Sequence, residues 1–224
     1  MPIKLRTPPA GEPLSLAEVK LHLRIDNSDE DLLLTMLISA ARLHAENVTR
    51  RAFMTQTYDL YLDRFPRQNF YGVFPGYIPI DQYIPSVIQS ERGYAIRFMG
   101  GKIELPFPPF ETIALIEYLD TTGTMITMPS TAYALDGISE PAVLAPVPGT
   151  DWPQTMNTLN SVHIQYTAGY GDATTVPAGL KSWMLMRIGA LYETREEAII
   201  GQRITVAEMP FVDRLLDPYR IASI

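Results

Sequence analysis

The pattern of apolar residues is most regular over residues 29–51, where it predicts a long helix. Mostly apolar side chains recur at helical spacing in two adjacent stripes. One contains Leu33, Leu37, Ala40 and His44, and the other contains Leu34, Ile38, Ala41, Ala45 and Val48. The polar side chains form a narrow line through Thr35, Ser39, Arg42, Glu46 and Thr49. A helix on the surface of a monomer needs only one apolar face. Two stripes therefore indicate two packing partners, the domain's own core and either another element or another subunit.

Shorter helices are predicted on both sides of this one. Ser15 and Glu18 fit a capping box, which predicts a helix through about Leu23. Ser28 and the acidic residues 29–31 then supply a start for the long helix. After Pro177 a third helix is apolar on most sides and is expected to be buried, with Leu180, Trp183, Met184, Leu185, Ile188, Leu191 and Tyr192 around it. A last short helix is expected from about Pro210 to Pro218.

The middle of the chain changes to the two-residue period of β-strands. The stretch QTYDLYLDRF alternates as a half-buried strand does, and AIRFMGGKIELPF predicts a hairpin that turns at Gly100-Gly101. ALIEYLDTTGTMITM predicts a second hairpin around Gly123, and three further short strands follow. The predicted fold is therefore α+β, a small helical bundle with an inserted antiparallel β unit. Its parts are residues 1–54 (helical), 55–172 (β-rich) and 173–224 (helical).

Residues 66–94 have no clean period and are rich in proline, glycine and aromatic residues, including Tyr71, Phe74, Tyr77 and Tyr83. A loop of this length in a compact domain is usually functional or disordered. Two interpretations stay open, an arm that packs on a neighbouring molecule and an excursion into solvent.

Composition narrows the class of function. The net charge of -7 argues against a general nucleic-acid binder, which needs an excess of basic residues. Arginine outnumbers lysine, and there are twelve tyrosines and ten methionines, a bias typical of interface centres. A GC-rich genome would also favour arginine. Cysteine is absent, which excludes disulfides and thiolate metal sites, and no apolar run has membrane-spanning length. A soluble intracellular protein is expected.

No catalytic constellation stands out. The glycine-rich stretch YTAGYGDATTVPAGLKS at residues 166–182 has Leu180 between Gly179 and Lys181, which breaks the phosphate-loop spacing. Thr174 occupies the place where a dinucleotide fingerprint requires glycine. We interpret the stretch as a strand-to-helix joint. The three histidines, His22, His44 and His163, have no metal-ligand spacing. Neither a cofactor, a metal ion nor an enzymatic activity is predicted.

The order of these segments resembles tailed-bacteriophage head–tail connector (adaptor) proteins. The similarity rests on PLSLAEVKLHLRID followed by DEDLLLTMLISAARLHAENVTRRAF and TQTYDLYLDRFP, and on VHIQYTAGYGDATTVPAGLKSWMLMRIGALYETREEA with the terminal LLDPYRI. It covers nearly the whole chain in the right order. Residues 66–94 depart from the pattern, because shorter family members pass more directly to the next strand.

The resemblance implies a structural protein of the virion, made in the cytoplasm of the host bacterium. It would form a homo-oligomeric ring, typically twelve-fold, beneath the portal protein. The ring would extend the DNA channel without sequence-specific DNA binding and would join a tail-completion or stopper protein. An acidic channel lining would repel DNA, and the net charge of -7 permits one.

Two sets of contact residues follow from this resemblance. A closed ring needs two different patches on each subunit, and we predict the subunit interface at Leu34, Ile38, Ala41, Arg42, Ala45, Tyr71, Phe74, Tyr77 and Tyr83. The portal contact is predicted at Phe211, Leu215, Leu216, Tyr219 and Arg220. The alternative function is a non-catalytic binding module that uses the aromatic arm to bind carbohydrate or peptide.

Overall fold

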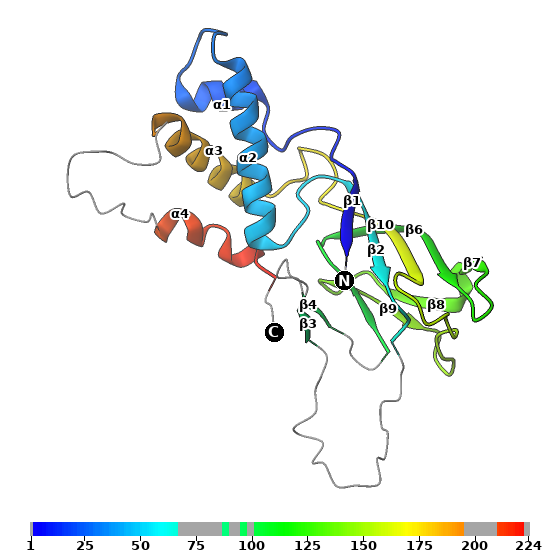
Figure 1. Ribbon diagram of the computed structural model, residues 1–224. Coiled ribbons are helices and arrows are strands. Elements are labelled where there is room, and N and C mark those ends of the chain that lie inside the picture. The colour runs from blue at the N-terminus through cyan, green and yellow to red at the C-terminus, as the bar shows by residue number, and fades with distance from the viewer. Residues whose placement is uncertain (1, 67–86, 90–94, 98–100, 195–209, 222–224) are drawn as a thin grey trace. The chain divides into compact units, whose positions relative to one another are not determined.

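The computed structural model describes residues 2–66, 87–89, 95–97, 101–194 and 210–221, and the chain divides into two compact units (Figure 1). The β unit comprises residues 1–8, 56–169 and 223–224, and the helical unit comprises residues 9–55 and 170–222. The predicted α+β class is confirmed, because helices and antiparallel sheets are both present.

The helical unit contains α1 (Leu16–Leu23), α2 (Asp31–Thr49), α3 (Ala178–Glu193), α4 (Pro210–Arg214) and a 3-10 turn at Asp217–Tyr219. The capping box is present: the Glu18 amide donates to Ser15 Oγ over 3.2 Å, and the Ser15 amide donates to Glu18 Oε2 over 2.7 Å. Ser28 does not cap α2. Glu30 occupies the N-cap position and makes no side-chain capping bond.

One hydrophobic core holds the helical unit together. Trp183 of α3 is fully buried in it, stacks on the His44 ring at a centroid distance of 5.6 Å, and donates from Nε1 to Asp213 Oδ1 over 3.3 Å. The other large buried members of this core include Leu34, Ile38, Phe53, Leu180, Met184, Ile188 and Leu216. The expectation that α3 is central and buried agrees with this arrangement.

The larger sheet of the β unit has five antiparallel strands in the order β1-β2-β10-β6-β7. Their bounds are β1 (Ile3–Thr7), β2 (Gln56–Leu62), β10 (Val162–Ala168), β6 (Phe110–Leu119) and β7 (Met125–Thr127). The β6–β7 hairpin is the predicted one, and Gly123 adopts φ +85° in its turn. Strand β1 was not predicted, because residues 1–54 were assigned to helices.

The second sheet has three strands in the order β5-β9-β8, where β5 is Ile103–Leu105, β9 is Ala142–Pro146 and β8 is Tyr133–Asp136. A separate pair joins β3 (Val87–Gln89) to β4 (Ala95–Arg97). The hairpin predicted at Gly100-Gly101 is therefore wrong. Its first strand, β4, pairs with β3, and its second strand, β5, pairs with β9.

The core of the β unit contains alternate residues of its strands, among them Leu60, Leu62, Ile103, Leu105, Ile116, Leu144, Ile164 and Tyr166. Trp152 stacks on Phe65 with ring centroids 4.7 Å apart and donates from Nε1 to the Gly101 carbonyl over 2.5 Å. The chain has two tryptophans. One lies in each unit, so each unit carries its own fluorescent probe.

Candidate protein-interaction site

The polar line of α2 is buried inside the helical unit at Arg42, Glu46 and Thr49, whereas Ser39 is half-buried and Thr35 is exposed. Arg42 donates from Nε to Glu12 Oε2 over 2.7 Å and from Nη1 to Glu46 Oε2 over 2.9 Å. Ser39 Oγ donates to Glu12 Oε1 over 2.7 Å, and the Phe53 amide donates to Glu46 Oε1 over 2.9 Å. The segment before α1 and the residues after α2 therefore satisfy the polar groups of this helix.

These carboxylates also control the charge of Arg42. Burial disfavours its guanidinium cation, but the hydrogen bonds that Arg42 donates to Glu12 and the negative charge of Glu46 outweigh that effect and raise the pKa of Arg42 above its ordinary value. Arg42 is thus a charged residue at every accessible pH and belongs to an internal ion-pair network.

This arrangement changes the predicted subunit interface. Leu34, Ile38, Ala41 and Ala45 are at most 3% exposed and belong to the core of the helical unit. Arg42 is 7% exposed and paired with Glu12 and Glu46. Side chains this deeply buried have no surface to offer a second copy. The structure assigns these five residues to internal packing.

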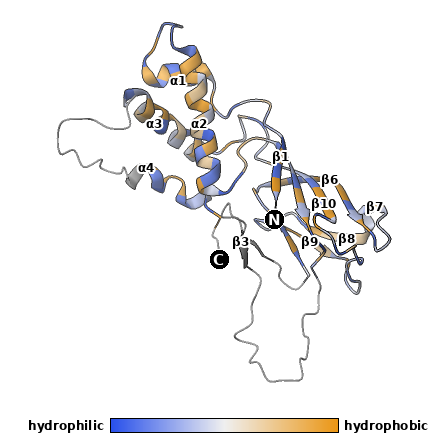
Figure 2. Cartoon of the chain, viewed as in Figure 1, coloured by the Kyte–Doolittle hydropathy of each residue, from blue (hydrophilic) through white to orange (hydrophobic). Residues whose placement is uncertain are grey.

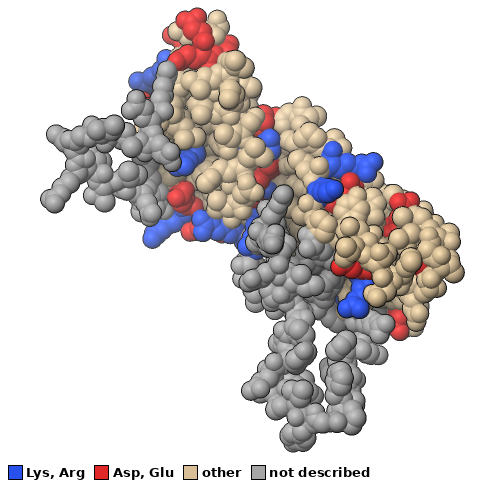
Figure 3. All heavy atoms as spheres, in the orientation of Figure 1, with Lys and Arg blue, Asp and Glu red and all other residues tan. Residues whose placement is uncertain are grey.

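The exposed side of α2 is apolar instead. Leu32 is 77% exposed, Met36 63% and Leu43 49%, and Ala40 lies exposed between them. We call these four residues the α2 ridge. Figure 2 shows the apolar character of α2, and Figure 3 shows an uncharged surface over this helix below the acidic residues at its start. A helix that buries its polar line and exposes an apolar one is typical of a surface that another molecule covers.

Periodicity did not predict the α2 ridge, because it grouped the residues of this helix into one stripe with Leu33 and Leu37 and another with Leu34 and Ile38. The subunit interface was predicted on the second stripe. A usable signal was present in the pattern: positions 32, 36, 40, 43 and 47 contain no charged residue. His44 stacks on Trp183, which also accounts for its place on an apolar face.

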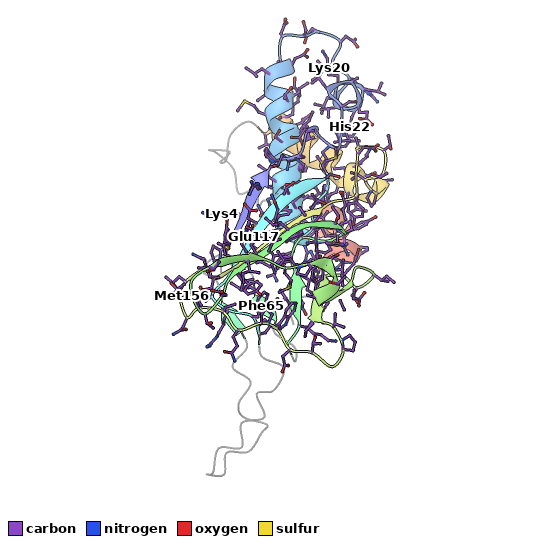
Figure 4. The ribbon with its side chains drawn as sticks, turned by 90° about the vertical axis from the view of Figure 1, so that its right-hand side faces the viewer. Lys4, Lys20, His22, Phe65, Glu117 and Met156 are labelled. Atoms are coloured by element: carbon purple, nitrogen blue, oxygen red, sulfur yellow. The ribbon has the colours of Figure 1, made fainter. Side chains whose placement is uncertain are left out.

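A groove of about 380 Å³ lies between α1 and α3 of the same unit. Its apolar lining is Leu14, Leu21, Ala178 and Leu185, and Leu21 is 82% exposed. Glu18, Lys181 and His22 also line this α1–α3 groove, and Figure 4 labels His22 on α1. An apolar groove with a few charged lining residues is suited to receive side chains of a protein partner.

The pKa of the Glu18 carboxyl is expected to lie below its ordinary value. Hydrogen bonds from the hydroxyl and then the backbone amide of Ser15 hold its pKa down. Because the folded-state pKa is depressed, this capping contribution is present above the unfolded pKa and is lost as the pH falls through the folded pKa. NMR titration of the Glu18 carboxyl measures it. Ser15→Ala should raise the pKa, whereas Ser15→Thr should preserve the shift; an unchanged pKa in Ser15→Ala would contradict the assignment.

The glycine-rich stretch is a strand-to-helix joint, as predicted. Strand β10 ends at Ala168 and α3 begins at Ala178 after Pro177. Asp172 Oδ1 accepts from the Thr174 amide over 2.7 Å and from Thr174 Oγ1 over 2.5 Å. The Asp172 carboxylate therefore already accepts the hydrogen bond that the Thr174 amide could donate to a phosphate. Its negative charge would also repel a phosphate group.

Gly171 should tolerate substitution poorly. Its φ is +102°, and an added Cβ would lie 3.1 Å from Thr175 Oγ1. Gly171→Ala is expected to destabilise the helical unit by about 1–3 kcal/mol. Urea unfolding followed by Trp183 emission in a Trp152→Phe background measures the change. Gly11→Ala is the matched control, because no atom lies within 4 Å of its added Cβ; equal stabilities for the two variants would refute the prediction.

The predicted portal-contact residues lie in a segment that folds onto the helical unit. Leu216 is 1% exposed in the core, and Leu215 packs against that core. Tyr219 accepts from Arg51 Nε at its carbonyl over 2.6 Å. Arg220 is exposed and lies 3.4 Å from Asp217. Phe211 lies in α4, but its side chain is outside the described residues. Arg220 is the charged residue of the predicted set, and the structure places it on the surface.

The other predicted contacts cannot be placed in the same way. Tyr71, Phe74, Tyr77 and Tyr83 lie outside the described residues, so their role in an interface, or in carbohydrate or peptide binding, stays a prediction. Among the residues that the structure does describe, no three His, Asp or Glu side chains gather as a metal site. No helix in that part of the chain is long and apolar enough to cross a membrane.

One polar cluster lies on the five-stranded sheet of the β unit. His163 Nε2 lies 3.0 Å from Asp59 Oδ1, and His163 Nδ1 lies 3.8 Å from Glu117 Oε2. Arg6 Nη1 lies 3.4 Å from Asp59 Oδ2, and the Tyr61 ring stacks on His163. Figure 4 labels Glu117 on this sheet. The residues pair across neighbouring strands, which accounts for their positions without a ligand.

Comparison with known proteins identifies related chains. A family model described as Phage gp6-like head-tail connector protein matches residues 13–96. Among solved structures, a chain in the neck of an empty gene transfer agent (GTA) particle, computed with C6 symmetry, is 20% identical with a TM-score of 0.69. Chains from the virion of the native GTA particle and from its neck, computed with C12 symmetry, are also 20% identical, with TM-scores of 0.70 and 0.65.

Each of these matches covers 100% of this chain and 97% of the other. A comparison with curated protein sequences found no match. The resemblance to phage head–tail connectors is confirmed by the family match, and the shared fold extends over the whole chain. That family is structural, so the expectation of a non-enzymatic protein is confirmed as well.

Proposed function

We propose that this chain, which is similar to phage head–tail connectors in sequence and in fold, is a structural connector in the neck of a tailed phage or phage-like particle. The observation that carries the proposal is the family match over residues 13–96, which include α1 and α2. The chain would form a ring, typically twelve-fold, beneath the portal, extend the DNA channel and join the capsid to a tail-completion protein. Its place of synthesis would be the bacterial cytoplasm.

Two observations support assembly over a function as a monomer. The similar GTA chains come from necks computed with C6 and C12 symmetry, and such symmetry belongs to closed rings. The α2 ridge adds an exposed apolar line within the matched region. The net charge of -7 permits a channel wall that repels DNA, and the DNA would pass without sequence-specific binding.

The test is to add the purified full-length chain to cognate capsids that carry a portal but no neck, and to image them by cryo-electron microscopy. An added ring beneath the portal is the expected result. Arg220→Glu serves as a variant for the predicted portal contact, because Arg220 is exposed and its loss leaves the core intact. If the capsids bind no ring and the free chain binds a glycan or a peptide, the connector function is contradicted and the binding module is favoured.

A further inference from the structure

We infer that the α2 ridge of one copy seats in the α1–α3 groove of the next copy, so that the contact between copies joins two different apolar surfaces of the helical unit. The inference rests on the proposed ring and names the surfaces that build it. Leu32, Met36 and Leu43 provide the ridge, and Leu14, Leu21 and Leu185 line the groove.

The α2 ridge cannot reach the groove of its own chain. Leu34, Ile38 and Ala45 turn toward the core that α2 shares with α3. Successive helical residues are rotated by about 100°. Met36 is therefore on the opposite side of α2 from Ala45, and faces away from α3. Because α3 forms one wall of the groove, only a second molecule can bring a ridge to it.

The spacing and length of the ridge allow its central part to enter the groove. Leu32, Met36 and Ala40 are spaced by four residues and form the kind of row that packs into a groove between helical side chains. From Leu32 to Leu43 the ridge extends about 16 Å at 1.5 Å per residue. The groove borders Leu14, just over one turn of α1 from Glu18 to His22, and about two turns of α3 from Ala178 to Leu185. It can accept the central part of the ridge, around Met36.

The two surfaces also match in chemistry. The ridge positions carry no charge, so they can enter an apolar groove without desolvating an ion. Glu18 and Lys181 lie in the groove lining as an opposite-charge pair, which leaves its local charge balanced. A charged partner such as DNA would gain nothing from the apolar floor, whereas the uncharged ridge of a second copy would cover it.

A ridge-to-groove contact has a geometric consequence for assembly. Each copy donates its ridge to one neighbour and its groove to the other, so the interface is heterologous and closes into a ring when the rotation permits. An isologous contact between two ridges would instead stop at a dimer.

Cysteine cross-linking tests the pairing directly, since the chain has no cysteine of its own. The double variant Met36→Cys with Leu21→Cys changes two exposed side chains and should leave the fold intact, which circular dichroism checks. Treatment with a short bismaleimide, on concentrated free protein and on necks docked to capsids, should give a ladder of covalent multimers on a denaturing gel. The control pair Met36→Cys with Arg214→Cys keeps the ridge thiol but places the second thiol outside the groove lining, and should give no ladder.

Each outcome either supports or overturns the ridge-to-groove contact. A ladder that forms with the test pair and not with the control pair supports the inference. If the chain also fails to dock on capsids, that failure contradicts the connector function alone. Docked rings without a ladder overturn the inference and leave the connector function standing. Covalent dimers from Met36→Cys alone would show an isologous ridge contact and also overturn it. No ladder in either preparation and no docking would overturn both.

Discussion

Replacement of Trp183 by alanine is expected to lower the free energy of unfolding of the helical unit by about 3–5 kcal/mol, the cost of deleting a large buried aromatic side chain. Trp183 is fully buried among residues of α2 and α3, stacks on His44, and donates its indole hydrogen to Asp213. Its removal would leave a cavity that the surrounding helices can fill only in part.

Urea unfolding followed by circular dichroism at the helix band measures this effect. In the same variant Trp152 is the single remaining tryptophan and reports the β unit. Its emission should keep the parental midpoint if the two units unfold separately. Trp183→Phe retains a ring against His44 and should cost much less. A Trp183→Ala midpoint equal to that of Trp183→Phe would contradict the packing role of the indole.

Replacement of Glu46 by alanine should cost about 3 kcal/mol, near the lower end of what is lost when one partner of a buried ion pair is removed. Arg42 keeps its bonds to Glu12, which limits the loss. The Phe53 amide, which is buried, loses its acceptor at Glu46 Oε1. An unsatisfied buried amide adds its own desolvation penalty.

The measurement is urea unfolding of Trp183 emission in the Trp152→Phe background. Glu46→Gln is the matched control, because its amide oxygen can still accept from Phe53 while the negative charge is lost. We expect Glu46→Gln to lie between the parent and Glu46→Ala. If Glu46→Ala changed the free energy of unfolding by no more than a typical surface substitution does, about 0.5 kcal/mol, the buried network would have no stabilising role.

Local patterns in the sequence predicted the elements that depend on residues a few positions apart along the chain. Ser15 and Glu18 are three residues apart, and the β6–β7 hairpin turns within a few residues at Gly123. Capping and tight turns depend on such neighbours, so the signal is complete within the segment. The helical spacing of α2 was equally clear, and its observed bounds differ from 29–51 by two residues at each end.

The identity of the exposed face of α2 depended on residues far along the chain. Glu12 lies 30 residues before Arg42 and converts a polar line, which the pattern alone would place in water, into a buried network. Leu32 and Met36 lie on the opposite side of α2 from the core residues Leu34, Ile38 and Ala45, and they are exposed. Periodicity gives the angle between stripes but not which stripe faces the core. The interface was therefore predicted at Leu34, Ile38, Ala41 and Ala45, side chains that the helical unit buries.

The same reasoning explains the misassigned hairpin. Strand β5 pairs with β9, about forty residues later, and β1 pairs with β2 across the whole of the helical segment between them. Glycines at the expected turn favoured a local partner for β5. Pairing between distant strands is decided by the core that they enclose, for which a short window of sequence contains no signal.

The joint between β2 and β10 has a consequence for how such chains diversify. Gln56, the first residue of β2, pairs with Ala168, the last residue of β10. Just outside them the Thr55 amide donates to the Gly171 carbonyl and the Tyr170 amide to the Phe53 carbonyl. The polypeptide therefore leaves and re-enters the helical unit at adjacent points, the geometry in which domain insertions are tolerated. Residues 56–169 could be exchanged by recombination at these two points without remodelling the bundle, provided that the new segment keeps a strand to pair with β1.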